Sequence, residues 1–173
     1  TQTSSYSLTL SVPCTTWGSQ APPLIFSLLT LLRGKKLIIR NPNATRPWQH
    51  VLEPLSGYFI LAQRLVEERE AYQEGWNFGP EEDSVESVGT LVDILVDYWG
   101  DSAEWIKSKD IHPYETKILK LDSKKAKIEL EWSSRWGLKS ALNETVLWYK
   151  EWQKSHDINS FTINQIKKYE TYT

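Results

Sequence analysis

The sequence predicts a mixed α/β unit in which helices outnumber short strands. Leu37-Ile38-Ile39 is a β-branched run of the kind found in buried strands. From about Val51 to Glu70 and again from Val85 to Trp99, apolar residues recur at helical spacing. No internal repeat, heptad run or low-complexity tract is visible, which argues against solenoids and coiled coils. We therefore expect one compact α/β unit over most of the 173 residues.

The first long helix is expected from about Val51 to Glu70. Its charged residues are expected to form a solvated face. The apolar face that we expect to enter the core consists of Leu52, Leu55, Phe59, Ala62 and Leu65.

Punctuating residues divide the middle of the chain. Trp76-Asn77-Phe78 before Gly79-Pro80 predicts a strand stopped by a turn, with Asn77 pointing away from its aromatic neighbours. Ser84 is placed to cap a helix that runs to Trp99 and ends at Gly100. A short edge strand is expected at Trp105 and Ile106.

The last third of the chain is expected to be helical. Asp122 can cap a short helix over residues 123–130. A longer helix is expected from Leu138, and the Thr162-x-x-Gln165 pattern predicts the start of a small terminal helix.

Composition excludes several classes of protein. The net charge is −2 and the two signs are interspersed, so no footprint for nucleic acid appears. Cys14 is the single cysteine, which rules out an intramolecular disulfide and fits a reducing, cytoplasmic setting. The apolar run Pro22 to Leu32 is too short to span a bilayer, and its positive charges follow it, unlike those of a signal peptide. We expect a buried or amphipathic helix there and no membrane partner.

The stretch Arg40 to Tyr58 gathers charge, aromatic rings and an imidazole at a strand-to-helix corner. Pro47 restricts the backbone of Arg46, and Pro54 suits the first turn of the following helix. Arg46 is thereby held next to a helix start, which favours an anion. The alternative is an exposed turn with a surface arginine, and composition alone leaves both open.

The segment Arg46-Pro47-Trp48-Gln49-His50-Val51 before a helix resembles the C-terminal half of the CDP-glucose 4,6-dehydratases, extended short-chain dehydrogenases/reductases that act on nucleotide sugars. The resemblance runs from about Arg33 to the end. Other matching segments are Glu74 to Pro80, Trp99-Gly100, His112-Pro113-Tyr114-Glu115 with Leu119 to Asp122, and Ser123 to Trp132.

The first 30 residues depart from this family. They are rich in Ser, Thr and Pro, and the match begins abruptly at Leu31. We expect residues 1–30 to be a divergent segment, disordered or produced by a frame shift, and residues 31–173 to be the nucleotide-sugar-binding domain. Glu131 is a further departure, because it stands where the family has glycine, and we expect slight strain in that turn.

The resemblance implies roles for four residues. Arg46, Asn77 and His112 would contact the phosphates, and Glu115 would hold the ribose. A carboxylate suits vicinal hydroxyls because it accepts hydrogen bonds from both, whereas a histidine gives weaker, pH-dependent phosphate contact than arginine. His112 and Glu115 also suggest metal ligands, but no third ligand lies at a recognisable spacing, so we expect no metal.

The catalytic parts implied by the resemblance are missing. The eight glycines never form the closely spaced pattern that a dinucleotide needs, and no tyrosine is followed by lysine four residues later. We therefore expect no catalytic residue and no NAD site in this chain; NAD and the Rossmann half would belong to a full-length, homo-oligomeric parent.

Three hypotheses remain open. The first is the CDP-glucose-binding part of a 4,6-dehydratase, a lyase of deoxysugar synthesis for surface polysaccharide such as the lipopolysaccharide O-antigen. The second is a non-catalytic or vestigial nucleotide-sugar-binding protein. The third is a related epimerase or dehydratase that uses another nucleotide.

Overall fold

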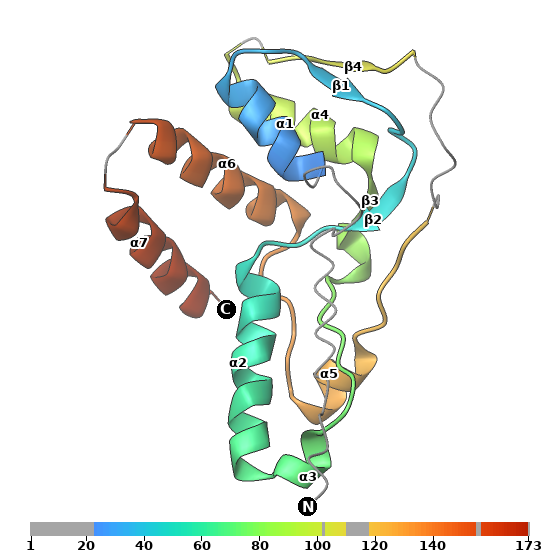
Figure 1. Cartoon of the computed structure of the whole chain (residues 1–173), viewed down its shortest axis with the longest axis vertical. Helices are drawn as coiled ribbons and strands as arrows, with labels where there is room; N and C mark the ends of the chain where they lie inside the picture. Colours follow the sequence, from blue (N-terminus) through green and yellow to red (C-terminus); the bar gives the residue numbers. More distant parts are fainter. Residues whose placement is uncertain (1–22, 102, 110–117, 155–156, 173) are drawn as a thin grey trace, which may run out of the picture.

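The fold was taken from a computed structural model, which describes residues 23–101, 103–109, 118–154 and 157–172. Helices dominate, joined by short strands and irregular segments (Figure 1). The helices are α1 (Pro23–Leu32), α2 (Leu52–Glu67), α3 (Arg69–Tyr72), the 3-10 turn η1 (Glu82–Ser84), α4 (Val88–Trp99), α5 (Lys124–Glu129), α6 (Leu138–Lys154) and α7 (Ile158–Glu170). The strands are β1 (Leu37–Ile39), β2 (Thr45–Pro47), β3 (Val85–Ser87) and β4 (Trp105–Lys107).

The strands form two pairs within the described ranges. β1 runs parallel to β4, with Ile38 opposite Ile106. β2 runs antiparallel to β3, with Arg46 opposite Glu86. The predicted edge strand at 105–106 is thus confirmed, and its partner is the predicted strand at 37–39.

Most of the apolar core lies between α1, α4 and α6, under β1 (Figure 1). Leu28 of α1 and Leu95 of α4 are fully buried there. The expected helix before residue 33 is therefore confirmed as part of the core. Because α1 crosses position 31 and residues 1–22 lie outside the described ranges, the domain boundary at residue 31 stays a prediction.

A second core joins α2 to α5. Trp76, Phe78 and Trp132 pack there against Leu61 of α2 and Ala126 of α5. A third, smaller cluster places Trp136 and Tyr169 of α7 next to the start of α2. α2 therefore connects the helical core to both smaller clusters.

The predicted core face of α2 was wrong in part, since Leu52 and Leu65 are half-buried against the two smaller clusters but Leu55 is exposed. Phe59 and Ala62 are exposed, and the residues that α2 buries are Glu53, Pro54, Gly57 and Leu61. Apolar residues occur on two sides of this helix, so periodicity could not tell which side meets the core. Gly57 decides it, because the absence of a side chain lets the ring of Phe78 approach the helix backbone.

The predicted strand at Trp76-Asn77-Phe78 was also wrong. The segment is irregular, although Trp76 and Phe78 are buried and Asn77 is exposed as expected. The alternation therefore comes from packing of two aromatic rings against α2 and α5, with no ladder partner in the described ranges.

Ser84 does not cap the helix that follows it. The residues 85–87 form β3, and α4 begins at Val88 with Ser87 accepting a hydrogen bond from the N–H of Thr90. Ser84 is buried and accepts instead from the N–H of Leu138, the first residue of α6. The predicted end of α4 is confirmed, since Gly100 has a φ of 66°.

The C-terminal elements follow the prediction closely. Asp122 accepts a hydrogen bond from the N–H of Lys124 at the start of α5, and α6 begins at Leu138 as expected. The terminal helix α7 starts earlier than predicted, with Asp157 capping it in place of Thr162. Glu131 has a φ of 53°, the left-handed region that a glycine would occupy without cost, so the expected strain is confirmed.

Candidate functional site

The candidate site is the corner at which β2 passes into α2. Arg46 lies on β2, half-buried, opposite Glu86 of β3. Its Nη1 donates a hydrogen bond to the carbonyl of Thr45 at 2.8 Å. A guanidinium has five N–H donors in a fixed fork, so this bond fixes the orientation of the group and leaves donors for an anion.

The residues after Arg46 tie the corner to its surroundings. The indole N–H of Trp48 donates to the carbonyl of Glu86 at 3.0 Å, which locks the loop onto β3. The amide Nε2 of Gln49 donates to the carbonyl of Phe78 at 2.9 Å. The Gln49 amide thereby joins the segment that carries Arg46 to the segment that carries Asn77.

Asn77 lies on the exposed side of its segment. Its Nδ2 donates to the carbonyl of Asp122 at 3.3 Å. This bond joins the Asn77 segment to the stretch just before α5. Arg46 and Asn77 are brought onto segments that contact each other, whereas His112 and Glu115 lie outside the described residues and stay predictions.

His50 belongs to the interior of the corner. Its Nδ1 accepts a hydrogen bond from the N–H of Leu52 at 3.3 Å. Its ring makes a T-shaped contact with the ring of Trp136, with 4.9 Å between the two ring centroids. Loss of hydration on burial lowers the pKa of His50 from 6.5 to about 4, against a smaller upward effect of Glu144. His50 is therefore neutral at pH 7 and supplies no positive charge for a phosphate.

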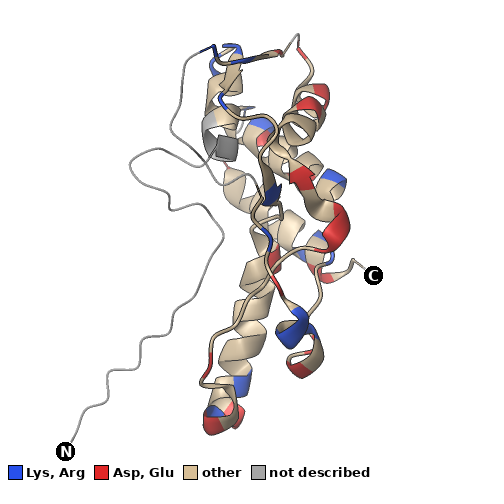
Figure 2. Ribbon diagram, turned by 90° about the vertical axis from the view of Figure 1, so that its right-hand side faces the viewer, with Lys and Arg blue, Asp and Glu red and all other residues tan. Residues whose placement is uncertain are grey.

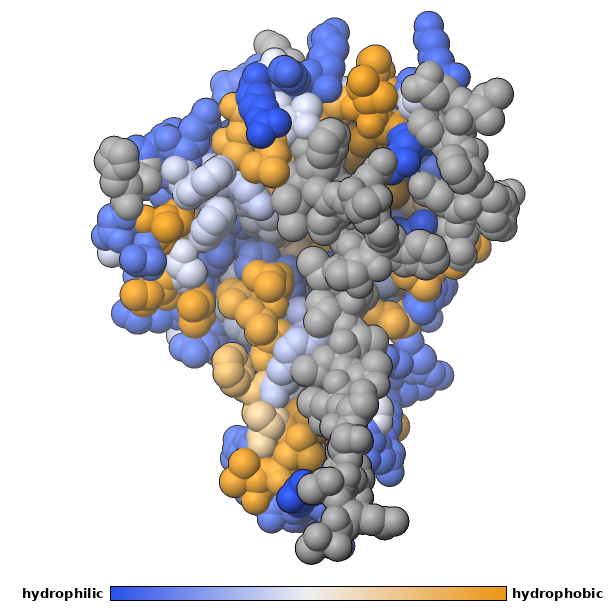
Figure 3. Space-filling model, viewed as in Figure 1, coloured by the Kyte–Doolittle hydropathy of each residue, from blue (hydrophilic) through white to orange (hydrophobic). Residues whose placement is uncertain are grey.

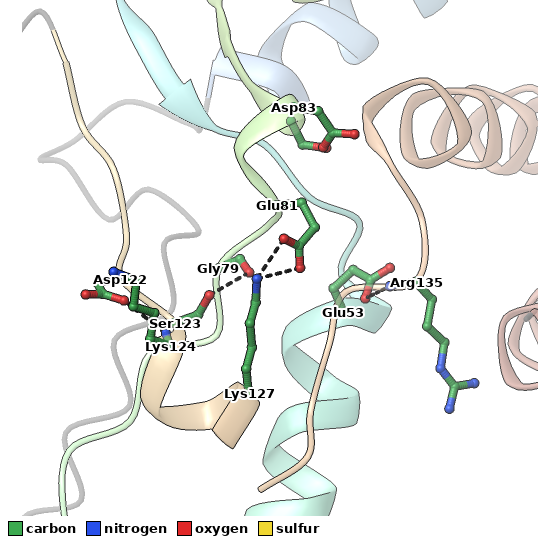
Figure 4. Close-up of polar contacts among 10 residues, drawn as sticks. Glu53, Gly79, Glu81, Asp83, Asp122, Ser123, Lys124, Lys127 and Arg135 are labelled. Carbon is green, nitrogen blue, oxygen red and sulfur yellow. Dashed lines mark hydrogen bonds and ion pairs between the residues drawn. The ribbon is translucent and has the colours of Figure 1, made fainter. Parts of the chain in front are cut away.

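Glu53 anchors the other side of the corner. This carboxylate, fully buried in the first turn of α2, accepts hydrogen bonds from the backbone N–H groups of Arg135 at 3.0 Å and Trp136 at 2.7 Å. The hydroxyl of Tyr169 donates to it at 2.7 Å. Figure 4 shows the Glu53 carboxylate directed at the Arg135 backbone, while the Arg135 guanidinium points away.

Sequence reasoning missed the role of Glu53. An acidic residue in a first helical turn is normally explained by the helix dipole. The residues around Glu53 in the sequence give no sign of hydrogen-bond partners more than 80 residues away. Arg135 completes the arrangement, because its guanidinium donates to the carbonyls of Tyr169 and Glu170 at 2.9 Å each. The end of α7 is thereby held against the start of α2.

An ion pair between α5 and residue 81 lies next to the Asn77 segment. Lys127 of α5 donates to the carboxylate of Glu81 at 2.7 Å, and the hydroxyl of Ser123 donates to the carbonyl of Gly79 (Figure 4). These bonds hold α5 against residues 79–81. Over the described residues, Lys and Arg are interspersed with Asp and Glu (Figure 2).

A cavity of about 400 Å³ lies elsewhere, where α1, α4 and α6 end. It includes neither Arg46 nor Asn77, and Lys36 and Lys150 at its rim bind Glu104 and the carbonyl of Tyr98. Cations at helix C-termini complement the helix dipoles, which gives these lysines a structural role.

Three of the described glycines pack closely against other parts of the chain. Gly57 faces the ring of Phe78, Gly79 faces Leu121, and Gly89 lies close to the carbonyl of Pro42, so all three pack against protein atoms.

Within the described ranges, no cluster of three or more His, Cys, Asp or Glu side chains could hold a metal ion. None of the helices in these ranges combines the length and apolar character needed to cross a bilayer.

The architecture is that of part of an extended short-chain dehydrogenase/reductase. It is similar to the structure of UDP-glucuronic acid 4-epimerase from Bacillus cereus in complex with UDP-glucuronic acid and NAD (TM-score 0.62, 21% identity, 79% of this chain and 43% of that chain). UDP-glucose 4-epimerase from Thermotoga maritima matches with a TM-score of 0.60 at 21% identity, over 81% of this chain and 41% of that chain. dTDP-glucose 4,6-dehydratase from Bacillus anthracis matches with a TM-score of 0.58 at 20% identity, over 75% and 39%.

Among curated proteins, the chain is similar in sequence to a CDP-glucose 4,6-dehydratase. The enzyme of that name from Salmonella typhimurium is 45% identical to this chain over 140 residues, which are 81% of this chain and 39% of the relative. The predicted resemblance is therefore confirmed, and the chain spans about two fifths of the length of the curated relative. No family model matches the chain.

Proposed function

We propose that this chain supplies the substrate-binding part of a CDP-glucose 4,6-dehydratase, the lyase that converts CDP-glucose to CDP-4-dehydro-6-deoxyglucose and water. The observation that carries the proposal is the 45% identity to the Salmonella typhimurium enzyme, which extends over 81% of the chain. The fold shared with dehydratases and epimerases of nucleotide sugars supports a ligand of that class.

The β2–α2 corner suggests how the diphosphate is held. Arg46 has its guanidinium oriented by the Thr45 carbonyl, and it can offer two parallel charge-assisted hydrogen bonds to phosphate oxygens. Asn77 and His112 assist with the phosphates in this proposal, and Glu115 accepts from the ribose hydroxyls. His50 has no such role, because its burial keeps it neutral.

The glycines of the sequence lack the close spacing of a dinucleotide site, so in this proposal the dinucleotide and the redox chemistry belong to the part of the dehydratase that this chain does not cover. The complete enzyme is then a cytoplasmic homo-oligomer of deoxysugar synthesis. The isolated chain is inactive as a dehydratase.

A chimera tests the proposal. The part of the Salmonella enzyme that this chain does not cover is joined to residues 23–173, which keep α1 whole, and formation of the dehydro-deoxy sugar from CDP-glucose is measured. We expect turnover by the chimera and none by the isolated chain. Arg46→Ala is expected to weaken CDP-glucose binding at least tenfold, since two charge-assisted bonds contribute about 2–3 kcal/mol.

Arg64→Ala is the matched control. Arg64 lies on α2 in an exposed pair with Glu67, so its loss is expected to leave CDP-glucose affinity unchanged. Equal affinity of the Arg46→Ala and parent chimeras would refute the site. Preference for another nucleotide would favour a related dehydratase or epimerase, and binding without turnover would favour the non-catalytic protein.

A further inference from the structure

Gln49 carries a half-buried side-chain amide beside the candidate site. It lies three residues after Arg46, and it bonds to Phe78, the residue directly after Asn77. Its Nε2 donates to the Phe78 carbonyl at 2.9 Å, and this bond fixes the orientation of the amide because only the nitrogen can donate to a carbonyl. The bond therefore connects the two described residues that we propose as phosphate contacts.

The other polar atom of this amide is unpaired within the described ranges. The Oε1 of Gln49 is buried, and no donor among the described residues reaches it. A buried acceptor without a donor costs free energy, which offsets what the Nε2 bond contributes. Stability alone therefore does not account for a glutamine at this position. Local costs of this kind are typical of residues that serve a functional site.

Both ends of the Gln49 bond are held by other contacts. On one side, the indole of Trp48 binds the β3 backbone. On the other side, the ring of Phe78 makes T-shaped contacts with Tyr58 and Trp132. Each segment is ordered by these contacts, so the Gln49 bond sets the position of one segment relative to the other.

Apolar packing does not set this relative position by itself. α2 follows the corner and is packed on one side, where Gly57 admits the ring of Phe78. Figure 3 shows apolar side chains at the surface along α2, and Phe59 is 74% exposed. Apolar packing has no preferred direction, whereas a hydrogen bond needs a defined distance and angle. The directed bond of Gln49 therefore supplies a register that packing lacks.

We propose that Gln49 is a positioning residue, which holds the Arg46 guanidinium and the Asn77 amide at the separation that one diphosphate requires. This inference rests on the proposed function. Two contacts on separate segments bind one ligand most tightly when their spacing is preset, because otherwise binding must order them. Gln49 thereby contributes to affinity without touching the diphosphate.

The test compares the effect of Gln49→Met with and without the Asn77 amide. Methionine is similar in length to glutamine but cannot donate to the Phe78 carbonyl. Calorimetry on the chimera measures the affinity for CDP, which carries the diphosphate and no sugar that could react. We expect Gln49→Met to weaken CDP binding at least about threefold in the parent, and less than about 1.5-fold when Asn77→Ala is already present. Without the Asn77 amide, no second contact remains to be positioned.

Gln165→Met is the matched control. The Gln165 amide also donates to a backbone carbonyl at 2.9 Å, that of Glu144, but its bond joins α6 to α7. We expect Gln165→Met to lower the urea midpoint of this chain at least as much as Gln49→Met does. It is expected to leave the CDP affinity of the chimera unchanged in both backgrounds, which separates positioning from a general loss of stability.

Two results would overturn the proposal in a chimera that binds CDP. Equal losses of affinity from Gln49→Met in the two backgrounds would show that the residue has only a structural role. No loss in either background would show that the bond to Phe78 does not matter for the ligand. In both cases the proposed function stands while the positioning role fails.

A parent chimera that binds no CDP would instead refute the proposed function, and distances between spin labels then decide whether Gln49 sets the spacing. The labels are placed in this chain, with Cys14→Ser, at the exposed positions Asn43 and Gly75. We expect Gln49→Met to broaden the distribution of distances and Gln165→Met to leave it unchanged. An equally narrow distribution in the Gln49→Met chain refutes the positioning role.

Discussion

The carboxylate of Glu53 is completely buried and accepts three hydrogen bonds from two distant segments. The two carboxylate oxygens accept from the N–H groups of Arg135 and Trp136 and from the Tyr169 hydroxyl. These hydrogen bonds replace the water that the carboxylate loses on burial. A single side chain thereby fixes the start of α2 relative to α7.

Replacement of Glu53 by alanine is expected to lower the free energy of unfolding by about 3 kcal/mol or more. The buried N–H of Trp136 loses its acceptor, as do the part-buried N–H of Arg135 and the Tyr169 hydroxyl, and each unsatisfied donor costs about 1–3 kcal/mol. Urea unfolding followed by circular dichroism measures the change. Glu67→Ala, an exposed position on the same helix, is expected to cost less than about 0.5 kcal/mol, and similar losses in the two variants would contradict the role of Glu53.

His50 makes stability depend on pH. Burial lowers its pKa to about 4 in the folded chain, whereas the unfolded chain binds a proton near pH 6.5. Between these values the unfolded state holds more protons, so stability is fully present above pH 6.5 and is lost as the pH falls towards 4. The complete effect of such a lowered pKa is about 3 kcal/mol.

His50→Phe isolates this effect. The variant keeps a planar ring against Trp136 but cannot titrate, and we expect its unfolding free energy to fall less between pH 6.5 and 4 than that of the parent. Denaturant midpoints across this range provide the measurement. Parallel pH curves for parent and variant would show that His50 does not control acid stability.

At the scale of the elements, α2 is positioned by one glycine. Gly57→Ala is expected to destabilise the chain by about 1–3 kcal/mol through overpacking against Phe78, despite the better helix propensity of alanine. Thermal unfolding measures the loss. Gly75→Ala is the control, because an added Cβ there meets no atom within 4 Å, and an equal loss at Gly75 would refute close packing at Gly57.

Local sequence signals predicted the elements whose causes are local. Gly100 marked the end of α4 and Leu138 the start of α6 correctly. Arg46 was expected on a loop between a strand and a helix, and it lies instead on β2, a strand that the sequence did not predict, just before α2. The prediction for Ser84 was wrong because a serine before an apolar run can cap any helix whose N-terminus lies near it in space. Its hydroxyl accepts from the N–H of Leu138 at the start of α6, 54 residues further along. The segment 76–78 misled because packed aromatic rings imitate the alternation of a strand.

For the whole molecule, the helical core and the α2–α5 core could be anticipated only in part. Periodicity predicted α4 correctly, because this helix has one apolar face and the structure buries it. α2 has two, and no pattern in the sequence tells which of them faces the rest of this chain. Of the four predicted site residues, the structure places Arg46 and Asn77 on contacting segments, and the roles of all four stay proposals.

The bond between Tyr169 and Glu53 also sets an order of events during synthesis. These residues are separated by 116 positions, so at about 5–20 residues per second Glu53 is synthesised roughly 6–23 s before Tyr169. Throughout that time the Glu53 carboxylate must remain hydrated, and the first turn of α2 cannot settle into its final place. A nascent chain that terminates before Tyr169 leaves the Glu53 carboxylate without this hydroxyl donor.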